Sequence, residues 1–367
     1  MHELFDFADD LGPNKIIHIY NPTVKLKAVV AVDNVACGPA IGGIRMATDV
    51  SAEEAFRLAR AMTLKNAAAG LPHGGGKSVI MADPKMPSAE KEKLIRAFAG
   101  AIRGITDYIP GPDMGTDEQC MAWIKDEIDR AVGLPPEIGG IPLDEIGATG
   151  FGLSICTEVA TKFLDLPLRG ARVVVQGFGS VGQHAARFLS AKGAVLVGAA
   201  DSHGTLFNAN GIDVAQLIEL KHAGKSVVDY APGEKLDREA AIDIACDIWI
   251  PAARPDVLRA ENVSRLKTKL IVSGANIPAT AEAEQILHDR NVFMIPDFIA
   301  NAGGVICAAV EYHGGTQTTA FQMIEEKIRA NTTAVLEETA RTRGLPRQAA
   351  VALAERRVRA AMRYRRW

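Results

Sequence analysis

Residues 172–182 read RVVVQGFGSVG, a short apolar stretch that runs directly into three closely spaced glycines. The first five residues are rich in β-branched side chains, which favour a strand. Apolar residues then recur at the spacing of an amphipathic helix, at Val181, Ala185, Phe188 and Leu189. The glycines Gly177, Gly179 and Gly182 therefore form a Gly-x-Gly-x-x-Gly turn between a predicted strand and a predicted helix.

This context is typical of a dinucleotide-binding turn. The glycines permit a close approach of the backbone to a pyrophosphate, and the helix N-terminus points at it. The next predicted strand, residues 194–201, ends at Asp201, where a carboxylate hydrogen-bonds the ribose hydroxyls of a bound coenzyme. Asp201 favours NAD because a carboxylate repels a 2′-phosphate, whereas the neighbouring Ser202 and His203 are compatible with NADP. A purely structural strand–helix turn is the alternative.

The middle of the chain alternates strands with helices. After residues 172–176 and 194–201, further apolar strands are predicted at residues 246–253, 269–276 and 291–296. Helical stretches such as residues 279–290 separate them. This alternation predicts a doubly wound α/β fold with a parallel sheet, a Rossmann dinucleotide-binding domain over residues 149–320.

The two ends of the chain follow another pattern. Residues 1–148 have strand signals near 26–33 and 78–82 and predict a separate N-terminal α/β domain that carries the substrate. Residues 321–367 are almost wholly helical, with helices predicted over 318–343 and 346–364, and we expect them to pack back on the first domain. The chain has no internal repeat.

Composition excludes several classes of function. A net charge of −3 offers no electrostatic basis for binding nucleic acid or a membrane surface. No apolar run reaches the ~18 residues that span a bilayer. Five scattered cysteines without a Cys-x-x-Cys pair predict a reducing, cytoplasmic environment with neither structural zinc nor another metal site.

A second glycine cluster lies in KNAAAGLPHGGGKSVI, residues 65–80. It is not a phosphate-binding P-loop, because position 71 is leucine where that motif needs glycine, and a P-loop ATPase is therefore disfavoured. A capping box at Ser51 and Glu54 instead predicts a helix that runs through Lys65 and ends near Gly70. Lys65 extends the apolar side of that helix, Lys77 follows three glycines, and Asp113 precedes a helix with Thr116 as its predicted cap. Each of these residues alone has an ordinary structural explanation, either a lysine that snorkels outward or an aspartate in a turn. Two lysines and an aspartate together, beside a dinucleotide-binding fold, instead indicate a catalytic site.

Nine ordered stretches carry a family resemblance: GPAIGGIRM, MTLKNAAAGLPHGGGKS, DPK, GPDMGT, ATGFG, VQGFGSVG, IPAA, GANIP and IPDFIANAGGV. Along nearly its whole length the chain resembles the glutamate/leucine/phenylalanine/valine dehydrogenase family, and most closely its leucine/valine/phenylalanine branch. The resemblance implies an NAD-dependent enzyme that reversibly deaminates an L-amino acid to a 2-oxo acid and ammonia, and that forms homo-oligomers.

The resemblance also implies roles for single residues. Lys65 would bind the substrate α-carboxylate, Lys77 would act as a neutral amine that activates water, and Asp113 would carry protons to and from the nitrogen. Asn276 would lie near the amino group and the nicotinamide, and Thr149 would contact the carboxamide. The coenzyme-binding set would comprise Thr149, Gly177, Phe178, Gly179, Ser180, Val181, Gly182, Asp201, Ala252, Ala253 and Asn276. Ser180 departs from the asparagine that is usual at its position.

Residues at the side-chain pocket suggest which amino acid is used. Glutamate-specific members have lysine where this chain has Ile41, ahead of Gly42 and Gly43, and serine where it has Ala308. Both replacements favour an apolar substrate, because a buried, unpaired carboxylate is costly. Val305 matches the valine that leucine and valine enzymes have at this position. Gly111 matches the glycine of phenylalanine enzymes, and a glycine there would enlarge the pocket. Branched-chain substrates are predicted, with an aromatic amino acid as the alternative.

A catalytically silent dinucleotide sensor on the same fold is the rival hypothesis from another class. The joint presence of Lys65, Lys77 and Asp113 disfavours it, because a sensor needs no proton carrier.

Overall fold

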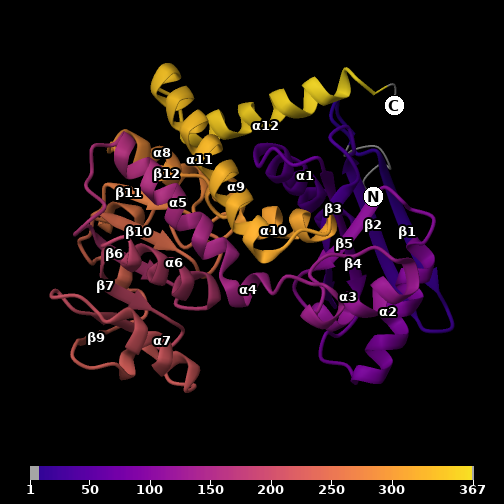
Figure 1. Ribbon diagram of the computed structural model, residues 1–367, viewed down its shortest axis with the longest axis horizontal. Helices are drawn as coiled ribbons and strands as arrows, with labels where there is room; N and C mark the ends of the chain where they lie inside the picture. The colour runs from indigo at the N-terminus through magenta and orange to yellow at the C-terminus, as the bar shows by residue number, and fades with distance from the viewer. Residues whose placement is uncertain (1–7, 366–367) are drawn as a thin grey trace. The chain divides into compact units, whose positions relative to one another are not determined.

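The computed structural model describes residues 8–365, which form two compact units (Figure 1). The first unit comprises the described part of Met1–Leu143 together with Val305–Ala320 and the described part of Ala352–Trp367. The second comprises Asp144–Gly304 and Phe321–Val351. None of the helices within the described residues is long and apolar enough to cross a membrane.

The first unit is built on a five-stranded sheet in the order β1-β2-β4-β3-β5. Its strands are β1 (Lys15–Asn21), β2 (Leu26–Asn34), β3 (Ala40–Ala47), β4 (Gly74–Met81) and β5 (Tyr108–Pro112). β3 runs parallel to both of its neighbours, β4 and β5, whereas β1–β2 and β2–β4 are antiparallel pairs. The predicted strands near 26–33 and 78–82 are confirmed as β2 and β4, although β4 begins four residues earlier, within the glycines.

Helices cover both faces of this sheet. On one face, α2 (Ser88–Ile102) and α3 (Glu118–Ile128) bury Phe98 and Met121 against strand residues such as Ile44. On the other, α1 (Ala52–Ala68) packs Ala55 and Ala59 on the strands. Small side chains let α1 lie close to the sheet.

Two helix starts can be compared with their predicted caps. The Ser51 side chain accepts from the Glu54 amide, so the predicted cap of α1 is confirmed. The cap of α3 is Asp117, which accepts from the Cys120 amide. The prediction of Thr116 was wrong because the Thr116 hydroxyl donates to the Ile44 carbonyl at 2.8 Å instead.

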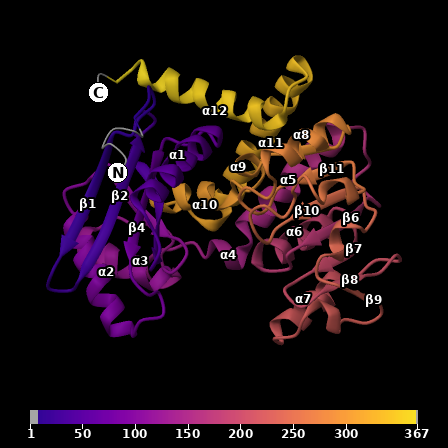
Figure 2. The ribbon, with the colours of Figure 1, turned by 180° about the vertical axis from the view of Figure 1, so that it is seen from behind.

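The second unit is built on a seven-stranded sheet in the order β12-β11-β10-β6-β7-β8-β9. Its strands are β6 (Arg172–Gln176), β7 (Val195–Ala200), β8 (Thr205–Phe207), β9 (Glu234–Leu236), β10 (Ile248–Pro251), β11 (Leu270–Val272) and β12 (Phe293–Ile295). The five predicted strands pair in parallel, which confirms the doubly wound Rossmann plan. The short antiparallel strands β8 and β9, which continue the sheet beyond β7, were not predicted (Figure 2).

The strands that follow β6 along the chain are first added on its β7 side and later on its β10 side, and such a switch point in strand order is where open α/β sheets bind ligands. The remaining helices are α4 (Leu143–Ile146), α5 (Ala148–Phe163), α6 (Ser180–Ala191), α7 (Val214–His222), α8 (Ala281–Asp289), α9 (Asp297–Ala300), α10 (Gly303–Tyr312), α11 (Gln317–Thr342) and α12 (Pro346–Met362). Short 3-10 turns lie at Pro136–Ile138, Val227–Asp229, Ala240–Ile242 and Val263–Arg265.

The C-terminal helices are shared between the units, whereas the sequence predicted that residues 321–367 all join the first. Phe321 of α11 packs edge-on against Phe151 of α5, with 4.8 Å between ring centroids, and Arg329 pairs with Glu158. These contacts place Phe321–Val351 in the second unit. In α12, Arg357 donates to the Ala68 carbonyl of α1 at 2.6 Å, which places this part of the helix in the first unit.

Candidate active site

Lys77 lies on β4 with only 7% of its surface exposed. The preceding glycines allow the strand to pack closely: a Cβ on Gly75 would lie 2.0 Å from the Thr63 amide of α1, and one on Gly76 would lie 2.8 Å from the Tyr108 ring. These glycines therefore serve the packing of β4 against α1 and against the Tyr108 ring of β5, in addition to any approach of a ligand.

The Lys77 ammonium forms an ion pair with the Asp113 carboxylate, so the structure brings the two predicted catalytic residues together. Arg45 binds the same carboxylate oxygen through its Nε atom at 3.3 Å. The other end of the Arg45 guanidinium pairs with Glu54 on α1 at 2.6 Å. Thr116 accepts from the Asp113 amide at 3.0 Å and so holds the backbone that carries the carboxylate.

Burial and charge set the protonation of this pair. Burial lowers the pKa of the Lys77 ammonium below its ordinary value; the Asp113 carboxylate opposes that shift and Arg45 adds to it. Burial by itself raises the pKa of Asp113, but Lys77 and Arg45 outweigh it, so the carboxyl pKa lies below its usual range. A lysine with a lowered pKa beside an ionised carboxylate is suited to acid–base catalysis.

The side chains of β3 alternate between the two faces of the sheet. Ala40, Ile44 and Met46 join the core beneath α2 and α3, so Ile41, Gly43 and Arg45 point to the opposite face. A Cβ on Gly43 would lie 3.2 Å from the Lys77 Nζ atom. Ile41, which is 4% exposed, is therefore an apolar residue on the catalytic face of the sheet.

Gly111 pairs with Gly43 in the register of β5 and β3. A Cβ on Gly111 would lie 3.0 Å from the Cγ2 atom of Val132, a residue that is 2% exposed. The space beside Gly111 is thus occupied by Val132, which differs from the expectation that this glycine enlarges a pocket. Sequence reasoning missed Val132 because it lies 21 positions further along the chain.

Lys65 is half-buried in the last turn of α1. The next residue, Asn66, donates to the Gly74 carbonyl at 2.7 Å and so joins the end of α1 to the start of β4. Lys65 and Lys77 are consequently carried by two directly linked elements.

Val305 and Ala308 lie on α10, and Ala308 is 8% exposed. The same helix carries Glu311, whose carboxylate accepts from the amides of Gly133, Leu134 and Ile141 at 2.8–3.1 Å. Glu311 therefore holds the segment that follows Val132, a role that no sequence motif indicated.

His313, just beyond α10, lies 3.0 Å from the Nε2 atom of His73, whose Nδ1 atom is 3.0 Å from the Pro39 carbonyl. A carbonyl only accepts, so Nδ1 of His73 carries the proton and His313 donates to Nε2. This contact fixes the end of α10 to the start of β4.

The glycine-rich turn of the second unit fits a dinucleotide. Gly177 has φ +102°, and a Cβ there would lie 2.6 Å from the Ala253 amide. A Cβ on Gly182 would lie 2.0 Å from the Gly177 carbonyl, whereas Gly179 faces open space. Because Gly179 caps α6 without a side-chain hydrogen bond, amides of the first helical turn are left to bind phosphate oxygens.

The other predicted coenzyme residues surround this turn or lie on neighbouring elements. Phe178 is buried, Val181 lies in the first turn of α6, and Ala252 and Ala253 follow β10. Ser180 donates to the Asp144 carbonyl at 3.2 Å. Thr149 lies in the first turn of α5, close to Gly304, where a Cβ would be 3.2 Å from the Thr149 hydroxyl. Asn276 accepts from Asn301 at 2.9 Å.

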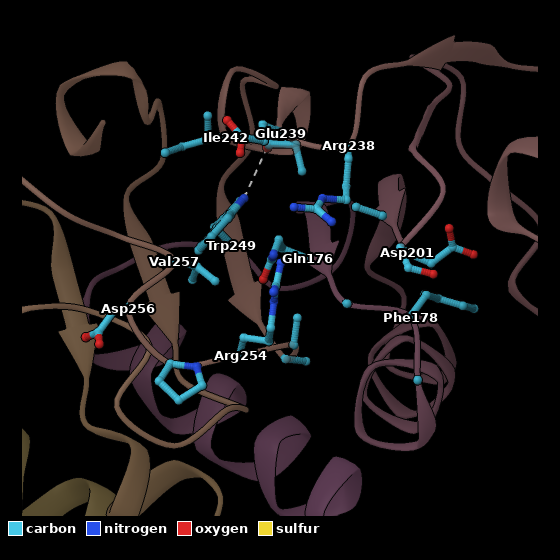
Figure 3. Close-up of a pocket in the computed structure, with 18 of the residues that line it drawn as sticks. Gln176, Phe178, Asp201, Arg238, Glu239, Ile242, Trp249, Arg254, Asp256 and Val257 are labelled. Carbon is cyan, nitrogen blue, oxygen red and sulfur yellow. Dashed lines mark hydrogen bonds between the residues drawn. The ribbon is translucent and has the colours of Figure 1, made fainter. Parts of the chain in front are cut away.

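A cavity of about 970 Å³ extends from the turn along the ends of β6 and β10 (Figure 3). Gln176, Trp249 and Arg254 line it. Asp201 also borders the cavity, but its carboxylate points away from the centre (Figure 3).

Comparison with known proteins identifies the family of the chain. Residues 139–366 match the Glutamate/Leucine/Phenylalanine/Valine dehydrogenase family, and residues 18–130 match the Glu/Leu/Phe/Val dehydrogenase dimerisation domain. The glutamate dehydrogenase of Aeropyrum pernix is 38% identical over 91% of this chain and 85% of its own length. The NADP-specific glutamate dehydrogenase of Saccharolobus shibatae is 41% identical over 76% of this chain and 69% of its own.

Among solved structures, the hetero-hexameric glutamate dehydrogenase of Thermus thermophilus in a leucine-bound form is similar, with a TM-score of 0.85 and 29% identity. The similarity covers 96% of this chain and 90% of that one. The relatives named here are glutamate dehydrogenases, so they support the reaction class and not the predicted branched-chain substrate. The chain belongs to the glutamate/leucine/phenylalanine/valine dehydrogenase family and is an amino-acid dehydrogenase.

Proposed function

We propose that this protein catalyses the reversible, nicotinamide-dinucleotide-dependent oxidative deamination of an apolar L-amino acid to a 2-oxo acid and ammonia. The observation that carries the proposal is the buried Lys77–Asp113 pair on a sheet face that also presents Ile41. The pair supports the reaction, and the apolar neighbour supports the substrate class.

The roles of the residues follow from their environment. Lys77, with its pKa lowered by burial, is the base that takes a proton from the water attacking the imine carbon. Asp113 accepts a proton from the substrate ammonium before the hydride leaves and returns it to the departing nitrogen, and Lys65 binds the substrate α-carboxylate. Arg45 is a positioning residue, because it holds the Asp113 carboxylate and raises the charge around Lys77.

The glycine-rich turn, Thr149 and Asn276 would hold the coenzyme. The coenzyme supplies the acceptor for the hydride that leaves the substrate Cα. The chain's own residues orient the two reactants and manage the protons.

Ile41 and Ala308 support an apolar side chain, because neither offers a partner to a second carboxylate. Leaving such a carboxylate buried without a partner costs about 1–3 kcal/mol or more. Val132 beside Gly111 supports an aliphatic substrate over an aromatic one, since it fills the space that a larger ring would need. Glutamate is the second candidate, favoured by the glutamate dehydrogenases at 38–41% identity.

We further propose that the chain forms homo-oligomers. The match of residues 18–130 to a dimerisation domain supports this, and Tyr20 on the edge strand β1 is 67% exposed. Size-exclusion chromatography with light scattering tests it; a monomer at micromolar concentration would contradict it.

A spectrophotometric screen of the L-amino acids, with NAD and NADP in separate assays, tests the substrate class. We expect leucine, valine or isoleucine to give the highest kcat/KM. A clear preference for glutamate would overturn the apolar assignment and leave the reaction class standing, whereas no turnover of any amino acid would overturn both.

A further inference from the structure

Ile277 follows Asn276 on the loop after β11, and its backbone is left-handed, with φ +48°. A β-branched residue rarely adopts this conformation, because its Cβ lies too close to the following carbonyl oxygen, so other contacts must hold it there. The residue is 54% exposed, and its backbone makes these contacts. The Ile277 amide donates to Oδ2 of Asp297 at 3.0 Å, and its carbonyl accepts from the Asp256 amide at 2.9 Å.

The Asp297 carboxylate is itself held in place. Asp297 is the first residue of α9, and its side chain is 8% exposed. Its Oδ1 atom forms an ion pair with Arg347, in the first turn of α12, at 2.9 Å. The Nε atom of the same guanidinium donates to both oxygens of Glu284 on α8, at 2.7 and 2.8 Å. The carboxylate of Asp297 therefore cannot turn away from Ile277 without losing an ion pair in a buried setting.

The end of α9 holds the Asn276 side chain. The Nδ2 atom of Asn301, the residue directly after α9, donates to the Gly274 carbonyl at 3.2 Å and to Oδ1 of Asn276 at 2.9 Å. A carbonyl only accepts, so the Asn301 group at this position is its NH2 group, and the Asn276 atom that faces it is the oxygen. The NH2 group of Asn276 is thus turned away from Asn301, on an exposed residue.

We propose that Asp297 is a positioning residue for the dehydrogenase reaction. By holding Ile277 in its left-handed conformation, it fixes the backbone of Asn276 so that the NH2 group of Asn276 donates to an oxygen of the bound coenzyme or substrate. Without this hydrogen bond the backbone at Ile277 would relax to a common conformation and rotate Asn276, and a displacement of about 1 Å can slow a reaction by about a hundredfold. This inference rests on the proposed function, since it assumes that Asn276 contacts the reactants.

Steady-state kinetics of Asp297→Ala, Asn276→Ala and the double variant test the proposal. We expect each single substitution to lower kcat/KM for the preferred amino acid by roughly tenfold or more. The double variant should be no slower than Asn276→Ala, because Asp297 acts through Asn276. A carboxylate that only stabilises the fold would lower kcat/KM by the same factor with and without Asn276, and that outcome would overturn the proposal.

Ile277→Gly provides a second test, because glycine adopts the left-handed conformation without strain. Adding Ile277→Gly to Asp297→Ala should restore part of the lost kcat/KM. Failure to restore any activity would show that Asp297 does not act through this backbone conformation. If Asp297→Ala does not fold, Asp297→Asn replaces it in both tests, since it keeps the size of the side chain and removes the ion pair with Arg347.

Asp247→Ala is the matched control. Asp247 is a half-buried carboxylate of the same unit that accepts from the Arg172 amide at 2.9 Å, and it precedes β10, at the opposite end of the parallel strands from Asn276. This variant should lower the midpoint of thermal unfolding and change kcat/KM by less than about threefold. If Asn276→Ala keeps wild-type kcat/KM, the role of Asn276 in the proposed function fails and the inference with it. If Asn276→Ala is slow and Asp297→Ala is not, the inference alone fails.

Discussion

The ammonium group of Lys77 and the carboxylate of Asp113 form an ion pair that is largely shielded from water. Arg45 contacts the same oxygen of Asp113, so two cations share one acceptor. Burial lowers the pKa of the Lys77 ammonium, and the positive charge of Arg45 adds to this shift while the Asp113 carboxylate opposes it.

Replacing Lys77 by alanine should remove the base from this pair. We expect kcat for the preferred amino acid to fall by about 10²- to 10⁴-fold, the usual contribution of a general base. Coenzyme affinity, measured by calorimetry, should be unchanged. Lys85→Ala, at an exposed position, is the control; wild-type turnover in the Lys77→Ala variant would refute the assigned role.

The pH dependence of oxidative deamination should report Lys77. Because the neutral amine is the active form, kcat/KM should rise as pH increases through the pKa of Lys77, at a value below the ordinary ~10.4. Asp113 raises that pKa, so Asp113→Asn should shift the rising limb to lower pH while kcat falls. If the rising limb of Asp113→Asn stays in place or moves to higher pH, Asp113 does not raise the pKa of Lys77. Asp49→Asn, which removes a charge at an exposed position, is the control variant for the same pH profile.

A double substitution, Ile41→Lys with Ala308→Ser, should restore polar partners for a side-chain carboxylate. We expect kcat/KM for glutamate to increase by roughly tenfold or more and that for leucine to decrease, because an ion pair replaces an apolar contact. Ile41→Met, which keeps an apolar side chain of similar volume, should leave the preference unaltered. The pocket assignment fails if the double variant gains no activity on glutamate.

Shortening Val132 to alanine should open space beside Gly111. The variant is expected to raise kcat/KM for phenylalanine relative to leucine by about tenfold, since one or two methyl groups typically change discrimination by that order. Val30→Ala creates a comparable cavity in the core under α2 and should leave the substrate ratio unchanged. Equal effects of the two substitutions would show that Val132 acts only on stability.

Local patterns predicted much of this structure. The RVVVQGFGSVG stretch determined a strand, a tight turn and a helix, because β-branched residues, glycines and helical periodicity each act over a few neighbouring positions. The Ser51 cap and the end of α1 near Gly70 followed in the same way. The joint occurrence of Lys77 and Asp113 in one unit was also foreseeable, through the family resemblance.

Other features depended on contacts between distant segments. The sequence placed a carboxylate at position 201, but only the fold showed its oxygens bound by Lys221, Ser226 and two amides. The partnership of Arg45 with Asp113 spans 68 positions and that of Glu311 with Gly133 spans 178. Periodicity and propensity describe one segment at a time, whereas hydrogen bonds and packing between segments require a precise direction and distance. The sequence thus determined which groups the protein has and the elements that carry them, and the tertiary structure decided which groups are buried, paired or left to face a ligand.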